Sequence, residues 1–246
     1  AMDMKPGLVA TPNGKVTCDT VIRATEGFTA TLPGQKRTWL PLNSAQIVTE
    51  PLPASLWAEI GWNGYELLGD MANAYCYCQR TDDGRIAVGG RGIPYKFGSK
   101  IDANGTPEPG TIRELTAILH RLFPMTKTIP LAHVWQGVLG VPRDWCATVG
   151  LDAGTRIGWA GGYVGVGVSS SNVAGRTLRD LVLGYDTPLT ALPWVNRRVR
   201  SWEPEPIRWA SVRGMYGLLK AADKWEAKSG ARWSPLSTIG NWIKGG

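Results

Sequence analysis

A glycine-rich segment in the second half of the chain sets the strongest limit on the fold. It reads Gly158-Trp159-Ala160-Gly161-Gly162-Tyr163-Val164-Gly165-Val166-Gly167 and runs toward a helical pattern that starts near Asn172. Glycine allows tight turns and lets the backbone approach a flat ligand. The first N–H groups of a helix are unpaired and carry a partial positive charge. The segment therefore predicts a strand, a glycine turn and a helix end that suits a phosphate or a ligand that becomes anionic, with a purely structural turn as the alternative.

Strand patterns dominate the first hundred residues, and helical patterns follow them. Alternating or apolar runs bounded by turn residues predict strands over residues 8–11, 16–24, 45–49, 74–80 and 85–89. Apolar residues on one face predict helices over residues 112–123, 172–184 and 215–228, with Thr111 and Glu114 as a capping box for the first of them. Strands followed by helices, rather than a regular alternation, indicate an α+β fold.

Composition limits the partners of this protein. The formal net charge is +7, and a basic face can bind nucleic acid, but the basic residues are dispersed apart from Arg197, Arg198 and Arg200. We therefore favour an incidental charge and expect no nucleic-acid partner. The four cysteines have no CxxC spacing and only two histidines are present, which predicts reduced structural thiols and no metal site.

The hydropathy pattern predicts a cytoplasmic protein without a membrane segment. The longest apolar stretches, such as residues 157–168, are broken by glycine and are shorter than the roughly 20 residues needed to cross a bilayer. The first residues, Ala-Met-Asp-Met-Lys-Pro, lack the charged-then-apolar order of a secretory signal.

A family resemblance rests on short stretches spread over nearly the whole chain. Besides the glycine-rich segment, they are Val21-Ile22-Arg23-Ala24-Thr25-Glu26-Gly27, Thr49-Glu50-Pro51-Leu52-Pro53, Gln79-Arg80-Thr81-Asp82-Asp83-Gly84, Gly89-Gly90-Arg91-Gly92, His133-Val134-Trp135-Gln136-Gly137, Ala174-Gly175-Arg176-Thr177 and Trp202-Glu203-Pro204-Glu205-Pro206. In this order they resemble the carboxy-terminal part of the D-amino-acid-oxidase-like superfamily, which includes glycine and sarcosine oxidases. More narrowly, they resemble bacterial gamma-glutamylputrescine oxidoreductase-like proteins. The resemblance implies FAD as the cofactor and an amine or amino acid as the small-molecule substrate, oxidised by hydride transfer to flavin.

The resemblance also implies a domain plan. Residues 1–32 would supply strands of an FAD-binding Rossmann-like domain, 33–130 a substrate-binding domain with a mixed antiparallel sheet and helices, 131–190 the C-terminal FAD-binding segment, and 191–246 a strap and a helix. The family grips the FAD pyrophosphate with a G-x-G-x-x-G turn, a spacing that the glycines of this chain do not fit. We therefore expect a truncated chain, with exposed apolar surface where the missing amino-terminal half or a second copy would dock.

The resemblance assigns candidate residues to two sites. For the cofactor they are Trp135, Gly137, Gly161, Gly162, Tyr163, Val164, Gly165, Gly167 and Asn172. For the substrate they are Arg91, whose planar guanidinium suits a carboxylate, and Tyr95, which would cover the same pocket. Each site has a purely structural alternative. Trp135 would fill the core, and Arg91 would be a loop residue exposed to solvent.

Further positions bear on the chemistry without assigning a catalytic residue. Val166 stands where relatives often carry a polar side chain, and Ala147 where they carry proline. His133 is interpreted as a structural hydrogen-bond donor, because an uncharged amine can pass a hydride to flavin without a strong protein base. Cys76 resembles the covalent flavin attachment point of sarcosine oxidases, with a small apolar filler as the favoured alternative.

Three functions compete at this point. In the first, the protein oxidises an amine or amino acid with FAD. In the second, this chain alone is an inactive scaffold or binding module, and retention of flavin separates it from the first. In the third, the basic, tryptophan-rich tail binds single-stranded nucleic acid, which predicts an affinity that falls steeply with salt.

Overall fold

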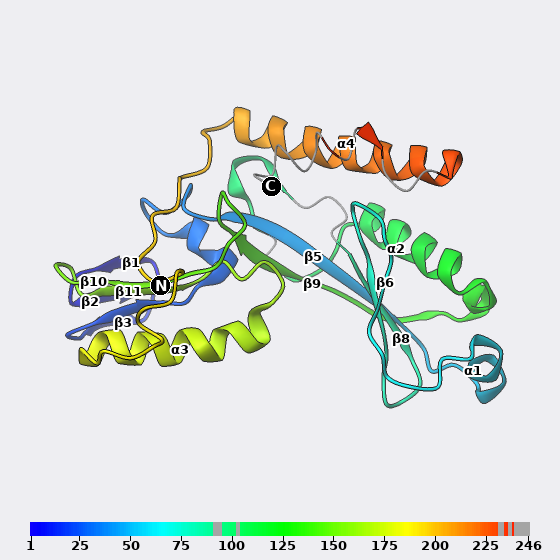
Figure 1. The fold of residues 1–246 in the computed structure, drawn as a ribbon, viewed down its shortest axis with the longest axis horizontal. Coiled ribbons are helices and arrows are strands. Elements are labelled where there is room, and N and C mark those ends of the chain that lie inside the picture. Colours follow the sequence, from blue (N-terminus) through cyan, green and yellow to red (C-terminus); the bar gives the residue numbers. More distant parts are fainter. Residues whose placement is uncertain (91–94, 102–103, 231–233, 236–237, 239–246) are drawn as a thin grey trace. The chain divides into compact units, whose positions relative to one another are not determined.

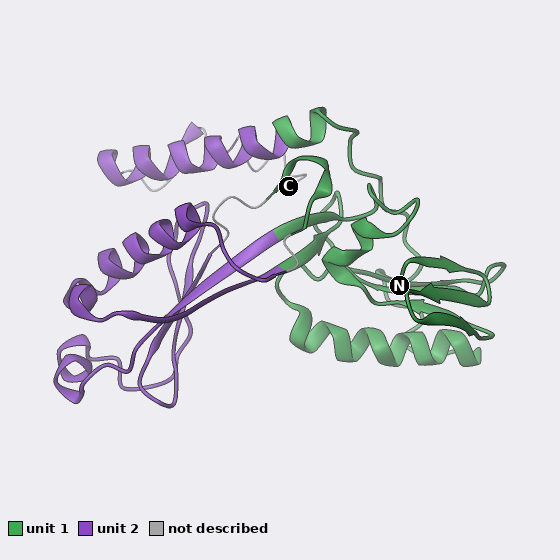
Figure 2. Ribbon diagram, turned by 180° about the vertical axis from the view of Figure 1, so that it is seen from behind, with its two compact units in different colours: residues 1–42, 95–101, 138–210 green, residues 43–94, 102–137, 211–246 purple. Residues whose placement is uncertain are grey.

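The computed structural model describes residues 1–90, 95–101, 104–230, 234–235 and 238. The chain divides into two compact units, and each is assembled from three segments (Figure 2). The first unit contains residues 1–42, 95–101 and 138–210, and the second contains residues 43–94, 102–137 and 211–246. Two strands, β5 (Leu40–Thr49) and β9 (Leu131–Val141), and helix α4 (Ile207–Ser229) contribute residues to both.

The first unit holds two three-stranded sheets. One is an antiparallel meander of β1 (Asp3–Lys5), β2 (Leu8–Thr11) and β3 (Gly14–Thr17). The other has the order β10-β11-β4, formed by β10 (Thr148–Asp152), β11 (Ile157–Gly161) and β4 (Val21–Arg23). In this sheet β11 is antiparallel to β10 and parallel to β4.

The prediction of a single strand over residues 16–24 is wrong. Pairing of β3 with β2 ends at Thr17, and pairing of β4 with β11 begins at Val21. Between them the N–H of Cys18 donates to the carbonyl oxygen of Gly7, which closes the meander. Residues 18–20 contain neither glycine nor proline to mark a break, but the chain changes sheets there.

Helix α3 (Gly167–Leu183) packs on the mixed sheet of the first unit (Figure 1). Its buried residues Ala174 and Leu178 join Val149 of β10 and Ala160 of β11 in one apolar cluster. The predicted start near Asn172 is wrong, because the helix begins at Gly167 and Asn172 lies exposed in its second turn. In the first turn only Val168 is apolar, and it is exposed, so the apolar pattern in the sequence starts later than the helix.

The second unit is built around a five-stranded sheet of order β6-β7-β8-β5-β9. Its other strands and its helices are β6 (Leu68–Gly69), β7 (Tyr77–Arg80), β8 (Ile86–Gly90), α1 (Ala54–Ile60), α2 (Pro109–Leu122) and the 3-10 helix η3 (Pro124–Thr128). The pairs β6–β7, β7–β8 and β8–β5 are antiparallel. The core lies between this sheet and α2, where Ile47, Ile86 and Val88 pack with Leu115 and Leu119.

The predicted capping box at the start of α2 is wrong. The helix begins at Pro109, so Thr111 lies inside its first turn and is buried. Glu108 occupies the capping position and makes no side-chain capping bond there. A proline at the first helical position already has the required φ, which explains the earlier start.

The architecture is a mixture of helices and mainly antiparallel sheets, in agreement with the expected combination of both. The two other 3-10 helices are η1 (Glu26–Thr31) and η2 (Phe97–Ser99). Within the described residues, no helix has the length and apolar character needed to span a membrane.

Candidate cofactor site

The glycine turn, residues 161–167, follows the carboxyl end of β11, which lies beside the carboxyl end of the parallel strand β4. Ligands of α/β sheets bind at such strand ends. Four residues of this turn have positive φ: Gly161 at +154°, Gly162 at +73°, Val164 at +51° and Gly165 at +105°. A positive φ is costly for valine, so the surrounding structure must hold the turn in this shape.

Two of the glycines are required by internal packing. A Cβ at Gly161 would lie 2.6 Å from the Trp39 ring, and a Cβ at Gly162 would lie 2.4 Å from the Pro142 ring. Gly165 differs, because among the described residues no atom beyond its own chain neighbours lies within 4 Å of the position that its Cβ would take. The start of the turn therefore packs against neighbouring side chains, whereas the turn is open at Gly165.

The carboxylate of Glu26 also holds the turn, through backbone hydrogen bonds. Its Oε1 accepts the N–H of Tyr163 at 3.1 Å, and its Oε2 accepts the N–H of Gly140 at 2.6 Å. Burial, and then the nearby charge of Glu26, raise the pKa of the Tyr163 hydroxyl. Sequence reasoning missed Glu26, although it lies in one of the stretches that carry the family resemblance.

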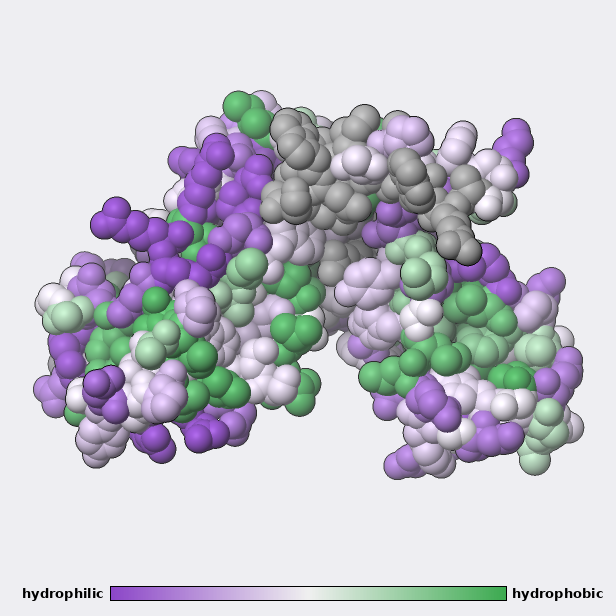
Figure 3. Space-filling view, in the orientation of Figure 1, coloured by the Kyte–Doolittle hydropathy of each residue, from purple (hydrophilic) through white to green (hydrophobic). Residues whose placement is uncertain are grey.

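The amino terminus of α3 is uncapped and partly apolar. Within the described part of the chain no side chain caps this end, and its first turn contains no acidic residue. The first N–H groups of a helix have no acceptor within the helix and carry a partial positive charge. Val166 is 65% exposed and Val168 is 96% exposed, and apolar side chains gather over the region of α3 (Figure 3). The arrangement suits a flat, partly apolar group that carries or acquires negative charge.

The structure brings six of the predicted cofactor residues together in the glycine turn: Gly161, Gly162, Tyr163, Val164, Gly165 and Gly167. Trp135 and Gly137 lie on β9, within the residues of the second unit. Trp135 is half-buried and stacks on the exposed His133 with ring centroids 5.7 Å apart, whereas Gly137 is exposed. The roles of Trp135, Gly137 and Asn172 stay predictions.

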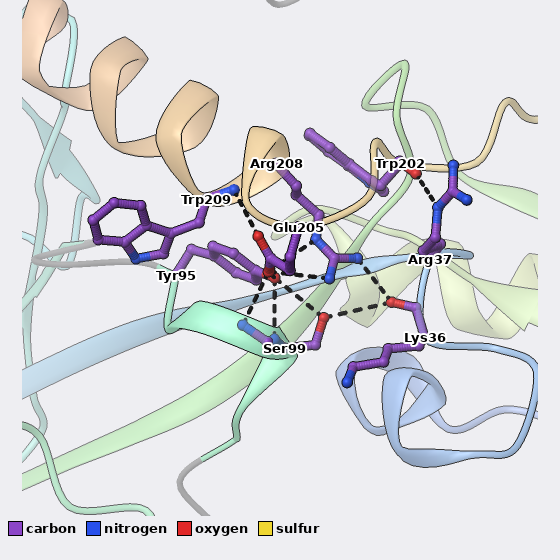
Figure 4. A network of polar contacts seen from close by, with 9 residues as sticks. Lys36, Arg37, Tyr95, Ser99, Trp202, Glu205, Arg208 and Trp209 are labelled. Atoms are coloured by element: carbon purple, nitrogen blue, oxygen red, sulfur yellow. Dashed lines mark hydrogen bonds and ion pairs between the residues drawn. The ribbon is translucent and has the colours of Figure 1, made fainter.

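The predicted substrate residues have different outcomes. Arg91 lies outside the described residues. Tyr95 is 1% exposed, and its hydroxyl donates to Oε1 of Glu205 at 2.5 Å (Figure 4). Burial, and then the hydrogen bond with Glu205, raise the pKa of Tyr95. A contact of Tyr95 with substrate stays a prediction, while its contact with Glu205 is part of the fold.

The Glu205 carboxylate lies at the centre of a polar network in the first unit. Besides Tyr95, its Oε1 accepts the N–H of Gly98 at 2.9 Å and pairs with Nη2 of Arg208 at 3.1 Å. Its Oε2 accepts the N–H of Trp209 at 3.0 Å, and Arg208 donates in turn to the carbonyl oxygen of Lys36 at 3.0 Å. The network therefore joins three segments of the chain that are far apart in sequence.

Two other sequence features are accounted for within the fold. Arg197 forms an ion pair with Asp144 at 2.7 Å, and Arg200 forms one with Glu203 at 3.4 Å, so part of the basic cluster is neutralised. Cys76 is buried, and its N–H donates to Asp70. Covalent attachment of flavin to Cys76 stays a prediction.

Comparison with known proteins decides the family. Residues 3–181 match the family model of the FAD dependent oxidoreductases (DAO). The chain belongs to this family. Probable oxidoreductase OrdL from Haemophilus influenzae is 26% identical in an alignment of 191 residues that covers 74% of this chain and 40% of that protein.

Solved structures of relatives of this DAO-family chain have the same fold at low sequence identity. Glycine oxidase from Geobacillus kaustophilus has a TM-score of 0.62 and 17% identity, with 78% of this chain and 48% of that chain covered. L-proline dehydrogenase from P. horikoshii has a TM-score of 0.60 and 19% identity, with 76% and 49% covered. Fructosyl peptide oxidase from E. terrenum has a TM-score of 0.63 and 14% identity, with 82% and 49% covered. The chain thus spans about half the length of these proteins.

The cofactor of the family is FAD. A flavin ring is flat and largely apolar, and it gains negative charge around N1 when reduced. The opening at Gly165, the uncapped end of α3 and the exposed Val166 and Val168 match these properties. The residues present therefore fit the ring end of FAD.

Proposed function

We propose that this chain forms the part of an FAD-dependent amine or amino-acid oxidoreductase that binds the flavin ring. The observation that carries the proposal is the glycine turn, open at Gly165 and followed by an uncapped helix end, in a chain of the DAO family. Relatives named for glycine, L-proline and fructosyl peptides support an amine or amino-acid substrate.

The chain's own contribution is binding and orientation. Backbone N–H groups of the glycine turn and of the first turn of α3 would donate to the pyrimidine end of the ring. Because these donors are already aimed, they stabilise negative charge there without reorganising when the charge appears. When bound, the flavin supplies the acceptor for the hydride of the amine. No protein base has to be assigned for this transfer.

We further propose which subgroup of the family the chain resembles and which parts of the chain form each domain. The sheet β10-β11-β4 with α3 would be the carboxy-terminal part of a Rossmann-like FAD-binding domain, and residues 33–130 would form the substrate-binding domain. Arg91 and Tyr95 would belong to the substrate site. Because the sequence resembles gamma-glutamylputrescine oxidoreductase-like proteins, gamma-glutamylputrescine is the first substrate to test.

Flavin retention tests the proposal against the inactive-scaffold alternative. The purified chain should turn yellow with FAD, and its flavin absorbance should survive desalting. Because the glycine turn would hold the ring end of FAD, riboflavin and FMN should bind to the chain as FAD does and should give the same fluorescence quenching. ADP should not compete with these flavins for binding. The proposal is rejected if the protein stays colourless after desalting and shows no fluorescence quenching with any of the three flavins. The inactive-scaffold alternative would then remain.

Substrate class is tested on the flavin-loaded chain under anaerobic conditions. Bleaching of the flavin absorbance is expected with an amine or amino acid from a panel of gamma-glutamylputrescine, glycine, sarcosine and L-proline. Bleaching by dithionite but by none of these compounds would reject the substrate class and retain the flavin site.

A further inference from the structure

We propose that Glu26 is a positioning residue for the flavin: its carboxylate fixes the ligand-facing shape of the glycine turn. This inference rests on the proposed function. The turn contains consecutive residues with positive φ, and such a backbone persists only where its surroundings hold it in place. Glu26 is the side chain that reaches it by hydrogen bonding.

Both oxygens of Glu26 are used by backbone donors. Oε1 accepts the N–H of Tyr163 at 3.1 Å, and Oε2 accepts the N–H of Gly140 at 2.6 Å. Hydrogen bonds from N–H groups to a carboxylate are about twice as strong as those between neutral groups. A carboxylate held in this way is poorly placed to take a proton from a substrate, so its role is to position rather than to act as a base.

The carboxylate fits a slot between two glycines. A Cβ at Gly140 would lie 2.7 Å from Oε2, and a Cβ at Gly161 would lie 3.3 Å from Oε1. On the same side of Gly161 the Trp39 ring approaches to 2.6 Å from the Cβ position. The neighbouring residues therefore leave room for the glutamate head group and keep it in register with both donors.

Tyr163 transmits this restraint to the helix. Its N–H is held by Glu26, and its carbonyl oxygen accepts the N–H of Val166 at 3.1 Å. Val166 is the residue at the capping position of α3. Glu26 thus holds the N–H of Tyr163, while the N–H of Val166 holds the carbonyl oxygen of the same residue. Together these contacts set the direction in which the following N–H groups of Gly165 and the helix end point.

Substitution of Glu26 should loosen the turn without removing any group that touches the flavin. Glu26→Gln keeps one carbonyl oxygen, which can accept only one of the two N–H groups. One of the amides of Gly140 and Tyr163 should therefore stay protected while hydrogen exchange at the other accelerates roughly tenfold, the effect of losing one hydrogen bond. Glu26→Ala should accelerate both. In each variant we expect flavin affinity to fall roughly tenfold and the absorbance bands of the bound ring to shift.

The experiment combines amide exchange by NMR on the 246-residue chain without ligand with fluorescence titration of FAD and spectra of the loaded chain. Glu59→Gln, on the exposed side of α1, removes the same charge and should change none of these quantities. General destabilisation would instead accelerate exchange throughout β10 and β11, and would leave the spectrum of whatever flavin binds unchanged.

The outcomes separate this inference from the function on which it rests. If the unaltered chain binds flavin and Glu26→Gln changes neither amide exchange nor affinity, the role of Glu26 is overturned while the function stands. Faster exchange with unchanged flavin affinity and spectrum would also overturn it, since the turn would then not position the ring. If the unaltered chain binds no flavin, the proposed function falls first and the inference falls with it.

Discussion

At the scale of single residues, the glycines of the turn after β11 serve two purposes. Gly162 has a φ of +73°, and a Cβ there would lie 2.4 Å from the Pro142 ring, so backbone and packing both exclude other residues. Gly165 has a φ of +105°, but in the part of the chain that the structure describes, no other residue beyond its chain neighbours lies within 4 Å of the position of its Cβ. Gly162 is therefore required by the fold, and Gly165 leaves room for a ligand.

Alanine at these two positions should separate stability from binding. Gly162→Ala adds backbone strain and a clash with Pro142, so we expect the free energy of unfolding to fall by about 3 kcal/mol. Gly165→Ala adds strain alone and should cost about 1 kcal/mol, while its methyl group should weaken flavin binding by filling the open side of the turn. Urea denaturation measures the first quantity and flavin titration the second. Equal losses of stability at the two positions would contradict this assignment.

Contiguous residues of the site could be predicted from the sequence, but their distant partners could not. Glycine spacing followed by a helical pattern identifies residues 161–167 as a turn. Glu26 meets Gly140 and Tyr163, which lie 114 and 137 positions away in the chain. No local pattern records which backbone N–H a carboxylate will meet, so only the fold could reveal Glu26 as part of the site.

At the scale of the elements, the amino terminus of α3 combines an unfilled capping position with free donors. Val166 provides no side-chain acceptor there, and a capping residue would add stability to the unliganded chain. A ligand with negative charge can take the same place. The absence of a cap on this helix is thus consistent with binding at its end.

Val166→Asp tests this interpretation of the helix end. The carboxylate would lie beside the free N–H groups, where a negative charge stabilises a helix by about 0.5 kcal/mol. The same charge would compete with the negative charge of the ligand, so flavin affinity should fall, and most strongly at low salt. Val166→Asn is the uncharged control of similar size. Equal flavin affinities of the Asp and Asn variants at low salt would contradict a role for the helix end.

Helix interiors followed from apolar periodicity, whereas the starts of α2, α3 and α4 did not, and α4 begins at Ile207 rather than at the predicted residue 215. The interior of α2 contains Leu115 and Leu119 at helical spacing, and both are in the core. The starts at Pro109 and Gly167 precede the apolar pattern, because a first turn depends on backbone geometry rather than on core packing. The prediction of Asn172 as a cofactor residue was made from the later helix start, and its role stays a prediction.

At the scale of the whole molecule, the family could be predicted while the grouping of segments could not. Short stretches keep their order along the chain, and the match over residues 3–181 confirms the family. Each compact unit, however, collects three separate segments. Pairing of β4 with β11 depends on contacts between distant residues, and nothing local in either strand specifies its partner.

Four carboxylates should make the folded chain sensitive to acid: Asp70, Asp180, Glu203 and Glu205. The hydrogen bond from Thr187 is the main cause of the lowered pKa of Asp180. For the other three, burial acts in the opposite direction and is outweighed by hydrogen bonds, so their pKa values are also lowered. A carboxyl with a lowered pKa in the folded state stabilises it above the ordinary pKa, and this contribution is lost as the pH falls through the lowered value. We therefore expect the free energy of unfolding to decline below about pH 4.

Glu205→Gln isolates one part of this acid sensitivity. The Arg208 side chain is 2% exposed, so removal of its carboxylate partner should cost about 3 kcal/mol at neutral pH. As the pH falls through the lowered pKa of Glu205, the glutamate of the unaltered chain becomes protonated and resembles glutamine, so the two stability curves should converge there. Urea denaturation across the pH range measures both curves, with Glu59→Gln expected to run parallel to the unaltered chain. If Glu205→Gln also runs parallel as the pH falls through this pKa, its pairing with Arg208 does not carry the acid sensitivity, and the other three carboxylates must account for it.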